Sequence, residues 1–342
     1  MRHIGIAVAA LTISMWTVAT SAIAQPEWKV SKTLHVGGTG AWDYLTVDPE
    51  THRLFIPRGT HTMVVDANTG KTLGDIQGQK IAHGVALVPK LDRGFISDGG
   101  GRIVIFNLKT YKVLGTITSE KDSDGIIYDA RMDRVLVVSG DGGDLMSFSP
   151  DIDPLHGKID TVIPLGGAPE FLATDASGKV YINLEDKNVV AVVDLAGKKV
   201  VARWPVDPGG APVGMAIDET NHRLVVGCRK PQKLIVLSTE DGKVISSMPI
   251  GAGVDATIAD GGEMFASCGD GTLSVIRETA PGTFAVVQMV QTMQGARTMG
   301  IDEMTHTIYL PTANFETTKM PAKGRPAIKP GTFKVLVVTR AK

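Results

Sequence analysis

The sequence predicts an all-β protein, a seven-bladed β-propeller built from four-stranded antiparallel blades, and three observations support this prediction. Short apolar segments alternate with turns rich in Asp, Asn and Gly, as in residues 211–251, which contain four such segments. This unit recurs with a period of about 40–45 residues, which is typical of a propeller. Its first strand ends at seven equivalent positions, here called the anchors: Asp48, Val88, Asp129, Asp175, Asp218, Asp260 and Asp302.

Residues 1–24 have the features of a secretory signal peptide. Arg2 provides a positive start, residues 4–18 are mostly apolar, and Ala24 ends a small-residue cleavage pattern. We therefore expect cleavage after Ala24, a periplasmic or secreted protein, and no membrane span in the mature chain. An uncleaved membrane anchor is the alternative. Residues 25–342 are expected to form a single propeller domain.

The two ends of the mature chain are expected to complete one blade together. The last unit has strands at residues 298–301, 307–311 and 333–339 and lacks a fourth strand. Residues 29–36 form a strand-like segment that precedes the first unit. We expect this segment to fill the gap, because it would close the ring and leave no sheet edge exposed.

The units between the two ends repeat the same pattern of four strands. They cover residues 45–76, 85–117, 126–165, 172–206, 213–250 and 257–291. His52, His222 and His306 recur in the turn between the first and second strands, and we interpret them as residues of a tight turn rather than as ligands.

Charge composition argues against two classes of partner. The chain has 35 Lys and Arg residues and 36 Asp and Glu residues, for a net charge of −1, and the two signs are interspersed. Such a surface offers no basic stripe for nucleic acid and no polybasic patch for a membrane. We expect a monomer whose partner is a small molecule or another protein of the cell envelope.

The repeats also resemble a known family. Residues 53–76, 179–206 and 223–251 follow the pattern of a strand, an Asn- or Gly-containing loop, a strand ending in Asp, and a turn before Gly-Lys. This pattern resembles the YVTN repeats of YncE-like secreted seven-bladed propellers, although the tetrapeptide YVTN is absent and VYIN at residues 180–183 is the nearest version. The resemblance implies a binding or scaffold protein of the envelope and supplies no catalytic motif.

A ring of polar residues is predicted where the innermost strands begin, at one mouth of the central channel. Counting back five residues from each anchor reaches a polar residue in six of the seven units. These residues are Asp43, His83, Asp124, Glu170, Asp255 and Arg297, and Val213 is the exception. Arg58 and Asp98, at the ends of second strands, are expected on the same face, where loops often carry function.

Three interpretations of this ring remain open. Carboxylates crowded together raise one another's pKa unless a cation neutralises them. The ring is therefore a polar channel lining paired with Arg297, Arg58 or Arg229, a site for a metal or cationic ligand, or a site of acid–base catalysis. Among cations, Ca²⁺ or Mg²⁺, and less favourably Zn²⁺, would suit one donor set. That set is Asp43, His83, Asp124, Glu170 and Asp255.

Two functions follow from these interpretations, and the sequence does not decide whether the protein is an enzyme. The first is a ligand- or protein-binding scaffold with a polar site at the channel mouth. The alternative is a divalent-metal-dependent hydrolase, such as a lactonase, that uses the carboxylate ring. Gluconolactonase-like propellers hold a divalent ion at the channel mouth, but this chain lacks the repeats of that family, so the analogy is weak.

Two further features concern the same face. Cys228 and Cys268 are the only cysteines and occupy equivalent places in adjacent blades. An oxidising compartment favours a disulfide, but facing sheets pack about 10 Å apart, so we expect two separate thiols, with a copper or mercury site as an alternative. Residues 314–331 form the longest loop, which is either a mobile excursion or a basic lid over the ring.

Overall fold

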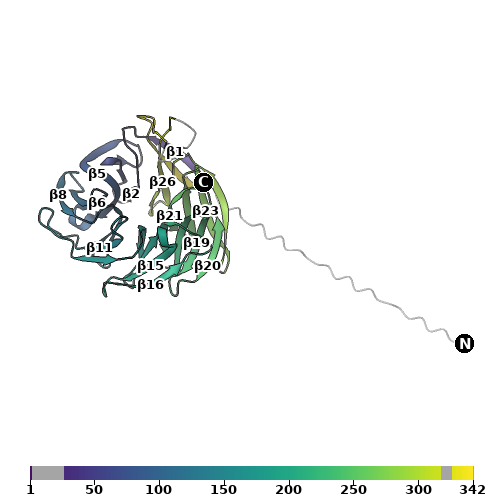
Figure 1. Ribbon diagram of the computed structural model, residues 1–342. Helices are drawn as coiled ribbons and strands as arrows, with labels where there is room; N and C mark the ends of the chain where they lie inside the picture. The colour runs from purple at the N-terminus through teal and green to yellow at the C-terminus, as the bar shows by residue number, and fades with distance from the viewer. Residues whose placement is uncertain (2–26, 317–325, 342) are drawn as a thin grey trace.

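The computed structural model describes residues 1, 27–316 and 326–341, and these residues form seven four-stranded antiparallel blades around a ring (Figure 1). The predicted fold class is therefore confirmed. The described part of the chain contains no α-helix, only the 3₁₀ turns η1 (Pro89–Leu91) and η2 (Glu185–Lys187). Within it, no helix has the length and apolar character needed to cross a bilayer. The predicted signal peptide, residues 1–24, lies almost wholly outside the described residues.

The blades follow one another in chain order. Blades 1 and 2 share the long strand β5 and comprise β2 (Thr46–Asp48), β3 (Arg53–Pro57), β4 (Gly59–Asp66), β5 (Thr72–Val88), β6 (Arg93–Asp98), β7 (Arg102–Asn107) and β8 (Val113–Thr118). Blades 3 and 4 comprise β9 (Ser123–Asp129), β10 (Arg134–Ser139), β11 (Asp144–Phe148), β12 (Thr161–Pro164), β13 (Pro169–Thr174), β14 (Lys179–Leu184), β15 (Val189–Asp194) and β16 (Lys199–Pro205). Blades 5 and 6 comprise β17 (Pro212–Asp218), β18 (Arg223–Arg229), β19 (Gln232–Ser238), β20 (Val244–Pro249), β21 (Val254–Asp260), β22 (Glu263–Cys268), β23 (Thr272–Ala280) and β24 (Thr283–Gln291). Blade 7 comprises β25 (Gly300–Asp302), β26 (Thr307–Thr312), β27 (Lys334–Arg340) and β1 (Trp28–His35).

Burial along the strands reflects where each one lies in its blade. The middle strands, such as β10 and β15, are almost wholly buried, because both faces of each sheet pack against a neighbouring blade. The outer strands alternate, as β16 does, because only one face meets a neighbour. Seven apolar clusters result, one between each pair of adjacent blades, such as the cluster that packs Leu54 of blade 1 against Val335 of blade 7.

The N-terminal strand closes the ring, as the strand count predicted. β1 pairs antiparallel with β27 from Trp28 opposite Arg340 to His35 opposite Lys334, one residue earlier than the predicted segment. Trp28 also fastens β1 to blade 6, since its Nε1 donates a 3.0 Å hydrogen bond to Glu263 and its ring packs edge-on against Phe265. Both ends of the chain thus contribute to one blade.

The recurring anchor residues serve the turns on the opposite face. Asp129 accepts backbone N–H groups of the following turn, and Asp302 does the same at its own turn. His52, His222 and His306 close the equivalent turns with φ angles of 53°, 54° and 53°, in the left-handed region. Their recurrence is therefore a requirement of turn geometry, as the sequence indicated.

Candidate ligand site at the mouth of the ring

The face with the candidate residues, here called the mouth face, is built by two sets of loops that pair with each other. The loop that leads into each first strand bonds to the loop between the second and third strands of that blade. Gly99 N–H donates to the carbonyl of Ile81 in blade 2 at 2.8 Å, and Gly269 N–H donates to that of Gly253 in blade 6 at 2.9 Å. This confirms that both sets of loops open on one face.

Buried hydroxyl groups fix the backbone of the site residues from the neighbouring blade. Ser97 of blade 2 donates to the carbonyl of Asp124 at 2.5 Å, and Thr298 of blade 7 donates to that of Asp43 at 3.1 Å. Both hydroxyl-bearing residues are fully buried. Glycine next to the site residues also permits close packing, because a Cβ on Gly125 would lie 2.9 Å from the carbonyl oxygen of Glu170.

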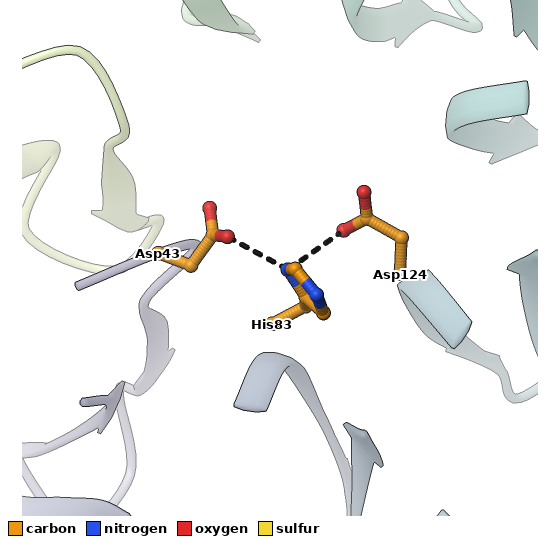
Figure 2. A group of neighbouring side chains, drawn as sticks. All are labelled: Asp43, His83 and Asp124. Carbon is orange, nitrogen blue, oxygen red and sulfur yellow. Dashed lines mark hydrogen bonds and ion pairs between the residues drawn. The ribbon is translucent and has the colours of Figure 1, made fainter. Parts of the chain in front are cut away.

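Three predicted residues from three blades meet in one group, the His83 group, which comprises Asp43, His83 and Asp124. Figure 2 shows the imidazole of His83 between the two carboxylates. Its Nδ1 lies 2.9 Å from Asp43 Oδ2 and 3.6 Å from Asp124 Oδ1. Its Nε2 lies 3.8 Å from Asp122 Oδ1. The group therefore holds one imidazole between two carboxylates, with a third carboxylate, that of Asp122, next to it.

Electrostatics in this group favour a protonated histidine and an incompletely ionised carboxylate. Burial lowers the pKa of His83, but the hydrogen bond that His83 donates to Asp43 and the charge of Asp124 outweigh it and raise that pKa to about 9. Burial raises the pKa of Asp124 to about 7, although the nearby charge of His83 acts in the opposite direction. Near neutral pH the group therefore holds a proton on His83 and a partial proton on Asp124.

The other side of the mouth carries arginines. Arg229 Nη2 and Arg297 Nε both donate to the carboxylate of Asp255, and Arg229 Nη1 also lies 3.5 Å from Glu185. Burial, followed by the charge of Asp124 and a hydrogen bond with Glu185, raises the pKa of Glu170 to about 9. Glu170 thus connects the acidic side of the mouth to the basic side.

Tyr44 spans the ring next to these residues. Its hydroxyl donates a 2.7 Å hydrogen bond to the carbonyl of Asp255 in blade 6, and its ring stacks on Phe171 of blade 4 with centroids 4.6 Å apart. Burial, and after it the charge of Asp255, raises the pKa of Tyr44 well above its ordinary value. The phenol therefore stays neutral and donates, which ties three blades together beside the polar residues.

The structure brings together the six ring residues but not the two strand-end residues predicted with them. Arg58 is buried and donates to the carbonyls of Gly37, Gly40 and Ala41, with its guanidinium 3.6 Å above the ring of Phe333. It holds the entry loop of blade 1, because the loop wraps its carbonyls around the side chain, and burial lowers its pKa to about 10.

Asp98 has a comparable structural role. Its carboxylate accepts the backbone N–H groups of Lys80, Ile81 and Gly100 and a hydrogen bond from Arg102. Asp98 therefore lies on the mouth face, where it was expected, with its carboxylate occupied by donors of the surrounding loops. Conversely, sequence reasoning gave no role to Tyr44 or Glu185, and named Arg229 only as a counter-ion. Tyr44 directly follows the ring residue Asp43, which was the one available signal.

The two cysteines are separate, buried thiols, as the blade spacing predicted. Burial raises the pKa of Cys228 to about 12. Burial and the charge of Asp270 together raise the pKa of Cys268 to about 12. Both thiols therefore stay protonated and are poor nucleophiles. The predicted basic loop, residues 314–331, falls partly outside the described residues. Three of its four basic residues (Lys319, Lys323 and Arg325) belong to the part that is not described.

Comparisons with known proteins bear on the fold. A chain of a mitotic checkpoint complex is 12% identical with a TM-score of 0.72, and the match covers 90% of this chain and 96% of that one. The WD40 repeats of RRP9 are 10% identical with a TM-score of 0.74, over 92% and 99% of the two chains. U3-55K is 10% identical with a TM-score of 0.73, over 89% and 97%. No family model and no curated protein matches the chain. At these identities, the likenesses establish a β-propeller similar to those of the WD40 type and nothing finer.

Proposed function

We propose that the protein is a secreted or periplasmic binding propeller of the YncE-like type, and that its polar mouth is a ligand site for a cation. The observation that carries this proposal is the His83 group, in which the imidazole of blade 2 faces carboxylates from blades 1 and 3. Buried ionisable groups are costly unless they are fully paired. The raised pKa of Asp124 indicates that its charge is not fully compensated, so a bound cation would stabilise it.

Zn²⁺ fits the donor atoms of the His83 group better than Ca²⁺ or Mg²⁺. The three ligand atoms lie within 4.8 Å of one another, and Nδ1 lies 2.9 and 3.6 Å from the two carboxylate oxygens. Ligands about 2.1 Å from a tetrahedral ion lie about 3.4 Å apart. Ca²⁺ and Mg²⁺ prefer oxygen ligands, whereas Zn²⁺ accepts imidazole nitrogen. Since His83 must lose its proton to bind a metal, affinity should increase with pH.

Calorimetric titration of the purified mature protein with Zn²⁺, Ca²⁺ and Mg²⁺ tests this proposal. We expect one Zn²⁺ per chain, with affinity that rises between pH 6 and pH 8. The double variant Asp43→Asn and Asp124→Asn should bind at least about tenfold more weakly. A matched control is Asp270→Asn, a mouth-face carboxylate outside the group, which should bind as wild type does. Absence of divalent-ion binding in wild type, or equal binding by the double variant, would reject the cation site.

A metal-dependent hydrolase is the second candidate, and one observation favours it. The pKa of Asp124, about 7, lies where a general acid or base works best near neutral pH. Turnover of five- and six-membered lactones, measured with and without Zn²⁺ or Ca²⁺, separates the two functions. Metal-dependent hydrolysis that Asp124→Asn removes would establish the enzyme, whereas metal binding without turnover would support the binding function.

The proposed compartment rests on the signal-like segment at residues 1–24. Expression of the full chain in a bacterial host, followed by cell fractionation, tests it. We expect a periplasmic or secreted product whose N-terminal residue is Gln25. A product that retains residues 1–24 and sediments with membranes would instead support the anchored alternative.

A further inference from the structure

A cavity of 560 Å³ opens on the mouth face beside the Asp255 carboxylate and its two arginines. Trp42 and Phe315 form an aromatic wall, Ile328 and Pro326 add further apolar groups, and Arg229 and Arg297 provide the cationic groups of the cavity. The volume lies in the range of small-molecule sites, roughly 300–1,000 Å³. The cavity is separate from the His83 group, since none of that group's residues lines it.

The aromatic wall consists of two tilted rings that are held in place by their surroundings. The rings of Trp42 and Phe315 lie 6.2 Å apart at an interplanar angle of 40°, and Trp42 also packs against Phe333 at 5.7 Å. Phe315 and Ile328 form an isolated β-bridge, which joins two segments of the blade 7 loop beside the cavity. A Cβ at Gly295 would lie 2.7 Å from the Phe315 ring, so glycine there lets the wall approach the backbone.

Two hydrogen-bond donors on the cavity's side chains have no acceptor among the described residues. One is Nε1 of Trp42, a residue that is only 4% exposed, and the other is Nη2 of Arg297. Arg297 uses its Nε for Asp255, a carboxylate that it shares with Arg229. Buried N–H groups in folded proteins almost always have a partner, so two such donors beside one cavity indicate a missing acceptor.

We infer that this cavity binds a flat, ring-containing carboxylate, with its ring against Trp42 and Phe315 and its carboxylate near the free donors of Trp42 and Arg297. An ionised acceptor is favoured over a neutral one, because hydrogen bonds from guanidinium to an anion are the stronger kind. Asp270 also lines the cavity, but it already accepts the N–H groups of Ala252 and Thr272, so its charge is stabilised by the loop.

This inference is independent of the cation site proposed above, because it rests on different side chains. It names the class of organic ligand that the mouth face accepts. The two sites lie on one face, since Trp42 directly precedes Asp43 in the entry loop of blade 1. Binding in the cavity should therefore require neither a metal ion nor the carboxylate of Asp124.

Calorimetry with 2-naphthoate as the probe, in buffer containing EDTA, tests the inference on the mature protein. The ring-matched cation 2-naphthylmethylamine is the comparison ligand. We expect one naphthoate per chain, bound at least about tenfold more tightly than the amine. Trp42→Phe keeps an aromatic wall but removes the N–H, so it should weaken naphthoate binding about fivefold. Arg297→Lys keeps the charge but removes Nη2, and should weaken binding at least as much.

Trp204→Phe is the matched control, because Trp204 lies on outer strand β16 and packs on Tyr181, away from the cavity. It should bind naphthoate as wild type does. The inference is overturned if wild type does not bind naphthoate, if the amine binds equally well, or if Trp42→Phe and Arg297→Lys both bind like wild type. Binding that appears only when Zn²⁺ replaces EDTA would also overturn it, since the carboxylate would then be bound to the metal, and the cation site would stand.

Discussion

Replacing Glu170 with glutamine should stabilise the fold at neutral and alkaline pH. Burial, the charge of Asp124 and the hydrogen bond with Glu185 raise the pKa of Glu170 from 4.5 to about 9. Between these values the folded protein holds a proton that the unfolded chain has lost, so the free energy of unfolding falls as pH rises through this window. In this window the free energy of unfolding falls by about 1.4 kcal/mol per pH unit, so about 3 kcal/mol has been lost at pH 7. This is an upper limit, because the side chain is partly exposed.

Urea denaturation of wild type and Glu170→Gln at pH 4 and pH 8 measures the effect. We expect the variant to gain about 1–3 kcal/mol of unfolding free energy at pH 8 and close to nothing at pH 4. Glu240→Gln, an exposed turn glutamate, is the matched control and should change stability by less than about 0.5 kcal/mol at both pH values. A loss of stability at pH 8, or the same gain at both pH values, would refute the electrostatic reasoning.

Three further outcomes are expected. Deleting residues 25–36 should lower the thermal midpoint of the whole ring, because β27 loses its partner strand; an unchanged midpoint would contradict closure by β1. A thiol reagent should leave Cys228 and Cys268 unmodified in the native protein and label both after denaturation without reductant, since both are buried and free; a linked peptide found by mass spectrometry would contradict this. Arg58→Met should destabilise the protein by about 2–4 kcal/mol, because three loop carbonyls lose their donor. Arg131→Met breaks a more exposed ion pair and should cost less than about 1 kcal/mol in the same denaturation assay.

The fold could be predicted because its determinants are local and repeated. Anchor aspartates such as Asp129 and Asp302 accept N–H groups of the turn that follows them, so the repeat is visible at the same position in several blades. The closing strand could be inferred because the last unit lacked one strand and the first was preceded by an extra one. The join between blades 1 and 2 was not foreseen, since β5 continues through residues 77–84, which the repeat pattern left between two units.

The site could be predicted only to the extent that the position of a residue along its strand determines which way its side chain faces. Equivalent positions on equivalent strands face the same way, which is why Asp43, His83 and Asp124 meet. The choice of partners across the ring is not a property of register, so the sharing of Asp255 by Arg229 and Arg297 could not be foreseen. The cavity depends on Phe315, which comes from a loop found in blade 7 and has no counterpart in the repeat.

The pairing of β1 with β27 has a consequence for how the molecule is made. A ribosome produces residues 28–35 first among the strands and residues 334–340 last, yet these two strands are neighbours. The ring therefore stays an open arc until the whole chain has emerged, with one unsatisfied backbone edge at each end of the arc. Contacts between such distant parts of a sequence form slowly. During that interval a second nascent copy could supply the missing strand, so dilution or a chaperone that shields the free edges should favour the closed monomer over interlocked chains.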